Sequence, residues 1–193
     1  MLPMLNISEA RPALLEMLQK KSLFRGDFTL SSGAKSNYYI DCKLTTLDPQ
    51  GVWLVGQLMR DLIRNEQAAR KVEVNAVGGL TMGADPIGLA VGMYSHWAKD
   101  ASPPRVFSVR KSAKAYGQTK LIEGNFRRGD KVAVIDDVVT RGESTIAAIK
   151  AVEEEGGRDK IEAMGHPVVA LFTKRELLGG DAESRKPADY AVA

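Results

Sequence analysis

Cysteine is almost absent from this chain of 193 residues, because Cys42 is the only one. No disulfide can form within this sequence, and a lone thiol fits a reducing compartment, where we expect it to be packed and unreactive. Long apolar runs are also missing, since no window approaches the roughly 18 apolar residues that cross a bilayer. The opening MLPMLNISEARPALLEML has no basic segment ahead of an apolar one. We therefore expect a soluble, cytoplasmic protein without a signal peptide or a membrane partner.

Neither sign of charge dominates. The formal net charge of +3 and the pI of about 8.9 are weak for a nucleic-acid-binding surface, although they slightly favour anionic ligands. The two histidines, His96 and His166, lack a Cys or His partner at metal-ligand spacing, so both are expected to be structural. With 44% hydrophobic and 26% charged residues, the chain fits a single α/β domain covering residues 1–193.

Apolar periodicity and turn residues predict helices and strands in alternation. Ser8 and Glu9 indicate a helix start, and Asp48 followed by Pro49 has the pattern of an N-cap. Further elements are expected as helices over residues 87–98 and 143–155, strands over 74–77, 105–109, 131–135 and 166–174, and a hairpin of 28–30 with 37–41. This alternation predicts a central, mostly parallel sheet flanked by helices.

The stretch VAVIDDVVTRGEST, residues 132–145, places two adjacent carboxylates at the end of an apolar strand. Ligands of an open parallel sheet bind beyond the carboxyl ends of its strands. A helix is expected directly after the pair, and its unpaired N–H groups suit a phosphate. The residues that would help to form the turn and donate hydrogen bonds there are Thr140, Gly142, Ser144 and Thr145.

Carboxylates can accept hydrogen bonds from a sugar diol or hold Mg²⁺ through water. A phosphoribosyl group carries a phosphate beside a cis-diol. Its diol would bind the two carboxylates, and its phosphate would bind the helix N-terminus. The alternative interpretation of an acidic pair at a strand end is a solvated turn in which a carboxylate caps the following helix. The hydroxyl and glycine pattern that follows Asp136 and Asp137 favours the ligand site.

Residues 110–129 separate two predicted strands without clear periodicity. Loops of this length inside a domain are usually functional or mobile. The basic side chains in the first half of the loop are Arg110, Lys111, Lys114 and Lys120. Without a neighbouring ligand site, a loop rich in basic side chains is usually a solvated surface. The functional interpretation of this loop therefore depends on the acidic pair.

The 132–145 stretch resembles the phosphoribosyl-pyrophosphate signature of type I phosphoribosyltransferases: apolar residues, Asp-Asp, two apolar residues, then Thr-x-Gly-x-Ser/Thr. The segments FTLSSGAKSNYYID, GGLTMGADPI and RKSAKAYG resemble the orotate phosphoribosyltransferase family in the same order and spacing. The resemblance implies the type I phosphoribosyltransferase fold, with a small hood from residues 20–45 and 173–193 and a mobile loop at 110–129.

The resemblance also implies an activity. The 5-phosphoribosyl group would pass from phosphoribosyl pyrophosphate to orotate, giving orotidine 5′-monophosphate and pyrophosphate in the de novo synthesis of UMP. The family pattern further implies dependence on Mg²⁺ and a homodimer in which the loop closes over the neighbouring subunit's site.

Individual roles follow from the same resemblance. Lys114 and Asp137 are the implied catalytic residues. The implied contacts of phosphoribosyl pyrophosphate are Arg110, Lys111, Lys114, Tyr116, Asp136, Asp137, Val138, Val139, Thr140, Arg141, Gly142, Glu143 and Ser144. The implied contacts of orotate are Tyr39, Ile40, Thr140 and Arg175. Mg²⁺ would be held mainly by the substrate, with Asp136 or Asp137 reaching it through water.

Some positions depart from the family pattern. Tyr116 replaces a loop histidine, and a tyrosine cannot become a cation near neutral pH. Ser31, Thr81 and Met82 stand where some members have a lysine and a Tyr-Lys pair. Two other functions stay open: the same transfer to another base, such as a purine, and a non-catalytic regulator that binds nucleotide or RNA.

Overall fold

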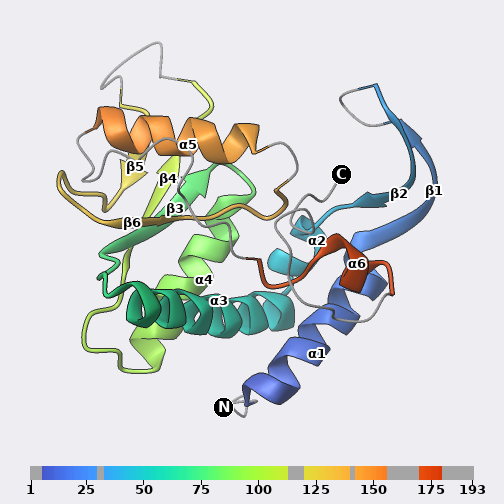
Figure 1. The fold of residues 1–193 in the computed structure, drawn as a ribbon, viewed down its shortest axis with the longest axis horizontal. Coiled ribbons are helices and arrows are strands. Elements are labelled where there is room, and N and C mark those ends of the chain that lie inside the picture. The colour runs from blue at the N-terminus through green and yellow to red at the C-terminus, as the bar shows by residue number, and fades with distance from the viewer. Residues whose placement is uncertain (1–5, 30–32, 113–119, 140–141, 156–169, 180–193) are drawn as a thin grey trace.

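The computed structural model describes residues 6–29, 33–112, 120–139, 142–155 and 170–179, and Figure 1 shows their arrangement. The helices are α1 (Ile7–Met17), α2 (Lys43–Thr46), α3 (Pro49–Arg70), α4 (Ala84–Trp97), α5 (Glu143–Glu154) and α6 (Lys174–Leu177), with a π-helical turn at Leu18–Ser22. The strands are β1 (Leu23–Thr29), β2 (Lys35–Ile40), β3 (Ala76–Leu80), β4 (Arg105–Val109), β5 (Ile122–Gly124) and β6 (Val132–Val134). No helix among the described residues is long and apolar enough to cross a membrane.

Within the described residues, the main sheet has the strand order β5-β4-β3-β6. β3 pairs in parallel with β4 and β6, whereas β5 is antiparallel to β4. α5 lies on one face of this sheet, and α3 and α4 lie on the other (Figure 1). Ala76 packs in the core on the α5 side and Val77 in the core on the opposite side, because successive strand side chains point to opposite faces. The predicted mostly parallel sheet flanked by helices is confirmed.

A second, two-stranded sheet formed by β1 and β2 lies beside α1, α2 and α6 (Figure 1). Its strands are antiparallel, with Leu23 opposite Ile40. The Arg25 guanidinium Nη2 donates to the Leu178 carbonyl at 3.1 Å, and the Lys174 ammonium lies 5.0 Å from the centre of the Tyr38 ring. These contacts join the hairpin to the described start of 173–193, the two segments from which a hood is predicted.

Two helix starts show how well local signals predict structure. Asp48 caps α3 as predicted, because its Oδ1 accepts from the backbone N–H groups of Gln50 and Gly51 at 2.9 and 3.0 Å. α1 begins earlier than the predicted Ser8. Its N-cap is Asn6, which exchanges hydrogen bonds with Glu9 in a capping box.

The predicted strand 74–77 is shifted in the structure. β3 begins at Ala76 and continues through Gly78 and Gly79 to Leu80. Gly78 and Gly79 belong to the strand, where neighbouring backbone comes very close to both. A Cβ on Gly78 would lie 2.1 Å from the carbonyl oxygen of Phe107, and one on Gly79 the same distance from that of Ile135.

Two further predictions are corrected. The second half of the predicted loop 110–129 contains β5, which pairs with β4 and therefore extends the sheet. The strand predicted over 166–174 is absent from its described end, residues 170–174. There Thr173 caps α6, which starts at Lys174; residues 166–169 lie outside the described residues.

Candidate functional site

The acidic pair, Asp136 and Asp137, follows β6 at the carboxyl edge of the sheet. The Ile135 N–H donates to the Gly78 carbonyl at 2.9 Å, which continues the β3–β6 pairing by one residue. Because β3, β4 and β6 are parallel, the ends of all three strands meet at this edge, where ligands of such sheets bind. The predicted position of the acidic pair is confirmed.

The loop between β3 and α4 packs directly against the acidic pair. A Cβ on Gly83 would lie 2.4 Å from Asp137 Oδ1 and 3.2 Å from Asp136 Oδ1. Only a residue without a side chain therefore lets the loop approach both carboxylates. This places Thr81 and Met82, which stand where some family members have a Tyr-Lys pair, in the loop at the edge of the site; Ser31 lies outside the described residues.

Asp136 is partly buried and sits in an unfavourable place for a negative charge. Burial first, and then the charge of Asp137, raise the pKa of Asp136 to about 6. Its Oδ1 accepts from the Asp137 N–H at 3.1 Å, and its Oδ2 lies 3.4 Å from the Thr145 hydroxyl. Thr145 was predicted to face an anion, but its hydroxyl instead donates weakly to Asp136.

α5 begins where the phosphate cradle is predicted. Gly142 has a left-handed φ of 75° at the N-cap position, a conformation that favours glycine. Its carbonyl accepts from the Ile146 N–H at 2.8 Å, so the N–H groups of the first helical turn point out of the helix end. Glu143 and Ser144 are exposed at this end. Thr140 and Arg141 lie outside the described residues.

Val138 and Val139 follow the acidic pair and are partly buried. The Val138 N–H donates to Asp137 Oδ1 at 3.0 Å. This bond fixes one carboxylate oxygen of Asp137 against its own backbone.

A segment far away in the sequence also approaches the acidic pair. Burial, then the charges of Asp137 and Asp41, raise the pKa of the Cys42 thiol to about 12, as expected for a packed thiol. The pKa of Lys43 is raised by its hydrogen bond with Asp41 and, to a smaller extent, by the charges of Asp41 and Asp137; the Lys43 Nζ lies 2.7 Å from Asp41 Oδ1. Sequence reasoning missed Lys43, because no motif linked it to the acidic pair.

The described part of the basic loop is anchored to the sheet. The Arg110 N–H donates to the Leu121 carbonyl at 2.9 Å, and the Arg110 Nη1 lies 3.6 Å from Glu123 Oε1. Lys111 is exposed. Lys114 and Tyr116 lie outside the described residues, so their predicted contacts stay predictions.

The described orotate candidates, Tyr39, Ile40 and Arg175, lie in the two segments from which a hood is predicted. Arg175 is an exposed residue of α6. Tyr39 is 44% exposed, and its ring centre lies 5.7 Å from that of Phe28. Ile40 is the next residue of β2, so its side chain points to the opposite face, where it packs against the main core.

Metal binding by histidine or cysteine finds no support in the part of the chain that the structure describes. There, no group of three or more His, Cys, Asp or Glu side chains could hold a metal ion. His96 is exposed near the end of α4, and His166 lies outside the described residues. The acidic pair offers carboxylate oxygens, the ligand type that Mg²⁺ prefers. With two such groups, it fits a Mg²⁺ whose remaining ligands come from water and substrate.

Known proteins resemble this chain over most of its length, although no family model matches it. The orotate phosphoribosyltransferase of Aquifex aeolicus is 40% identical over 87% of this chain and 97% of its own length. The crystal structure of the Mycobacterium tuberculosis orotate phosphoribosyltransferase with Fe(III) dicitrate is similar with a TM-score of 0.63 and 39% identity, over 77% of this chain and 79% of that one. The same enzyme in complex with phosphoribosyl pyrophosphate has a TM-score of 0.59 and 36% identity, over 77% of each chain.

Proposed function

This chain belongs to the orotate phosphoribosyltransferase family, and we propose how its residues carry out the transfer of a 5-phosphoribosyl group from phosphoribosyl pyrophosphate to orotate. The observation that carries the proposal is the position of the acidic pair. Asp136 and Asp137 lie between the β3–α4 loop at Gly83 and the first turn of α5. A diol beside the pair and a phosphate at the helix end would fit this arrangement together.

The ribose and its phosphate use the two parts of this edge differently. Asp136 and Asp137 accept hydrogen bonds from the ribose diol, since ionised carboxylates are pure acceptors. The first turn of α5 and the turn before it, residues 140–144, donate backbone N–H groups and the Ser144 hydroxyl to the 5′-phosphate. Glycine at 142 keeps this turn free of a side chain.

The reaction breaks the bond from the anomeric carbon to pyrophosphate and forms one from that carbon to a ring nitrogen of orotate. The sugar becomes cation-like on the way, while negative charge grows on the pyrophosphate. Arg110, Lys111 and Lys114 stabilise that charge, with Lys114 as the main catalytic cation. Asp136 and Asp137 would help to hold a Mg²⁺ through water, and such an ion would neutralise further pyrophosphate charge.

Orotate binds on the hood side. Its carboxylate pairs with the Arg175 guanidinium, which can donate two parallel hydrogen bonds. The exposed ring of Tyr39 offers a flat wall for the base. Ile40, at the adjacent position of β2, supports this wall from the core side.

A homodimer is the proposed working unit, and a surface of α4 supports it. Leu89, Met93 and Trp97 follow one another at intervals of one helical turn and are 55%, 62% and 37% exposed. Exposed apolar surface of this extent is typical of an interface. A Met93→Asp chain should therefore be monomeric in size-exclusion chromatography with light scattering. We also propose a cytoplasmic location, because Cys42 is a free thiol.

Kinetics test the residue roles. Lys114→Ala should lower kcat by about two to three orders of magnitude, because it removes charge that matters mainly in the transition state. If the loop acts across subunits, mixing Lys114→Ala chains with Asp137→Asn chains should restore activity in the hybrid dimer. An unchanged kcat in Lys114→Ala would refute the catalytic role, and no rescue in a verified hybrid would place loop and acidic pair in one subunit's site.

The two other functions predict different results. A purine-specific enzyme would not need a partner for a carboxylate, so Arg175→Ala would keep its full activity. A non-catalytic RNA-binding regulator would show salt-dependent RNA binding without turnover. The net charge of +3 and the relatives, which are orotate enzymes, favour the orotate reaction over both.

A further inference from the structure

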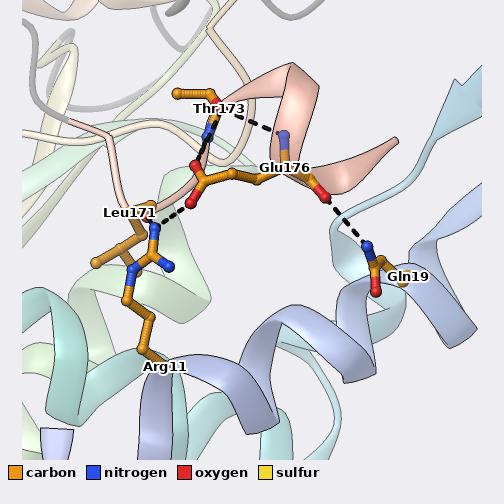
Figure 2. A network of polar contacts seen from close by, with 5 residues as sticks. All are labelled: Arg11, Gln19, Leu171, Thr173 and Glu176. Atoms are coloured by element: carbon orange, nitrogen blue, oxygen red, sulfur yellow. Dashed lines mark hydrogen bonds and ion pairs between the residues drawn. The ribbon is translucent and has the colours of Figure 1, made fainter. Parts of the chain in front are cut away.

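α6 carries Arg175 but is too short to be stable by itself. It has four residues, Lys174–Leu177, whereas isolated helices need about 12 to 15 residues to be even marginally stable in water. Contacts with the rest of the molecule must therefore hold α6, and with it the backbone of Arg175. Figure 2 shows the contacts that do so.

The side chain of Glu176 caps the start of α6 together with Thr173. Its Oε2 accepts from the Thr173 backbone N–H at 2.8 Å and from the Thr173 hydroxyl at 3.0 Å. The Thr173 hydroxyl oxygen in turn accepts from the Glu176 N–H at 3.3 Å. This capping box fixes the residues on both sides of Arg175.

The other carboxylate oxygen of Glu176 connects α6 to α1. Oε1 forms an ion pair with Arg11 Nη2, and the same nitrogen donates to the Leu171 carbonyl at 2.9 Å (Figure 2). The side chain of Glu176 is only 6% exposed. Burial acts to raise the pKa of Glu176, but the hydrogen bonds from Arg11 and Thr173 outweigh it and hold the pKa below its usual value.

A second side chain of the N-terminal helical segment holds the end of α6. Gln19 Nε2 lies 3.1 Å from the Glu176 carbonyl oxygen and 3.3 Å from that of Leu177. The Glu176 carbonyl also accepts from the Gly179 N–H at 3.1 Å, so Gln19 adds to the backbone hydrogen bond at the end of α6. On the hairpin side, Arg25 binds the Leu178 carbonyl. α6 is thus tied to α1 and to β1, which are distant from it in sequence.

We propose that Glu176, through its ion pair with Arg11, is a positioning residue for Arg175 and thereby sets the affinity for orotate. The inference rests on the proposed role of Arg175 in binding the orotate carboxylate. The bidentate geometry of a guanidinium–carboxylate pair tolerates little displacement. A shift of α6 relative to α1 therefore weakens orotate binding while leaving phosphoribosyl pyrophosphate at the acidic pair.

Steady-state kinetics of the Glu176→Gln enzyme test this proposal. The variant keeps the shape of the side chain but loses the ion pair with Arg11. We expect the KM for orotate to rise about tenfold, while kcat and the KM for phosphoribosyl pyrophosphate change less than about twofold. Arg11→Met should give the same pattern. The double variant should be no worse than Arg11→Met alone, because Arg11→Met already removes the ion pair that Glu176→Gln breaks.

A control separates positioning from general stability. Asp100→Asn breaks a similarly shielded ion pair between Asp100, which follows the end of α4, and Arg60 in the middle of α3. It should lower the melting temperature but leave the KM for orotate unchanged. If Glu176→Gln does not give folded protein, Gln19→Ala can be measured in its place. This variant removes only the Gln19 hydrogen bonds to the carbonyls of Glu176 and Leu177, and it should raise the KM for orotate by a smaller factor.

Arg175→Ala in the same assay distinguishes a failure of the proposed orotate contact from a failure of the positioning role of Glu176. If Arg175→Ala leaves the KM for orotate unchanged, the proposed orotate contact fails. If Arg175→Ala raises this KM but Glu176→Gln and Arg11→Met do not, the positioning role fails alone. Equal increases in the KM values of both substrates for Glu176→Gln would also overturn it.

Discussion

Asp136→Asn should stabilise the protein without ligands while abolishing its activity. In the folded protein, burial and the neighbouring Asp137 raise the pKa of Asp136 from 3.8 to about 6. Below pH 3.8 the carboxyl is protonated in the folded and the unfolded chain, so it costs nothing. Between these two values the unfolded chain releases the proton and the folded chain keeps it, so stability falls as pH rises and reaches its lowest level above about pH 6.

The size of the effect follows from the shift. About two pKa units correspond to nearly 3 kcal/mol, and the partial exposure of Asp136 reduces the expected value to about 1 to 1.5 kcal/mol. For a chain of this length, that is a rise in melting temperature of roughly 2 to 6 °C. The asparagine keeps an oxygen that can accept from the Asp137 N–H.

Thermal unfolding of wild type and Asp136→Asn between pH 4 and pH 8 measures the effect. The stabilisation should be small at pH 4, grow up to about pH 6.5 and then stay constant. Asp27→Asn, at an exposed carboxylate of β1, should show no such gain. A stabilisation of equal size at pH 4 and pH 7.5, or none at all, would refute the reasoning.

Three further results are expected. Gly83→Ala should lower kcat/KM at least tenfold, because the new Cβ would lie 2.4 Å from Asp137 Oδ1 and displace it; normal kinetics would show that the loop adapts. Cys42 should not react with a thiol reagent at pH 8 until the protein unfolds, since burial raises its pKa to about 12; rapid labelling of the native protein would contradict this. The hydrogen bond from Arg60 lowers the pKa of Asp100, so Asp100→Asn should lower the melting temperature at pH 7 by about 2 to 4 °C. This loss should shrink as pH falls below 3.8, and a constant loss would exclude the ion pair as its cause.

Local chemistry made part of the fold predictable. The Asp48 cap, the strand Arg105–Val109 and the start of α5 at Glu143 follow from side chains within a few residues of each element. The position of the acidic pair was also predictable, because the ends of parallel strands share one edge. These features depend on short stretches of sequence.

Features that depend on distant contacts could not be predicted in the same way. The strand predicted over 74–77 ends before Gly78, whose place in β3 depends on the backbone of Phe107 beside it. Arg11 and Glu176 are 165 residues apart in sequence, and no periodicity indicates their ion pair. The electrostatic interaction of Lys43 with Asp137 likewise joins residues that are far apart in the sequence.

The most direct test of the central claim follows the absorbance of orotate in a mixture of purified protein, phosphoribosyl pyrophosphate and Mg²⁺. The account predicts loss of orotate absorbance, formation of orotidine 5′-monophosphate, and no turnover when EDTA is added or when Asp137 is replaced by asparagine. A folded protein that binds phosphoribosyl pyrophosphate but leaves orotate unchanged would contradict it.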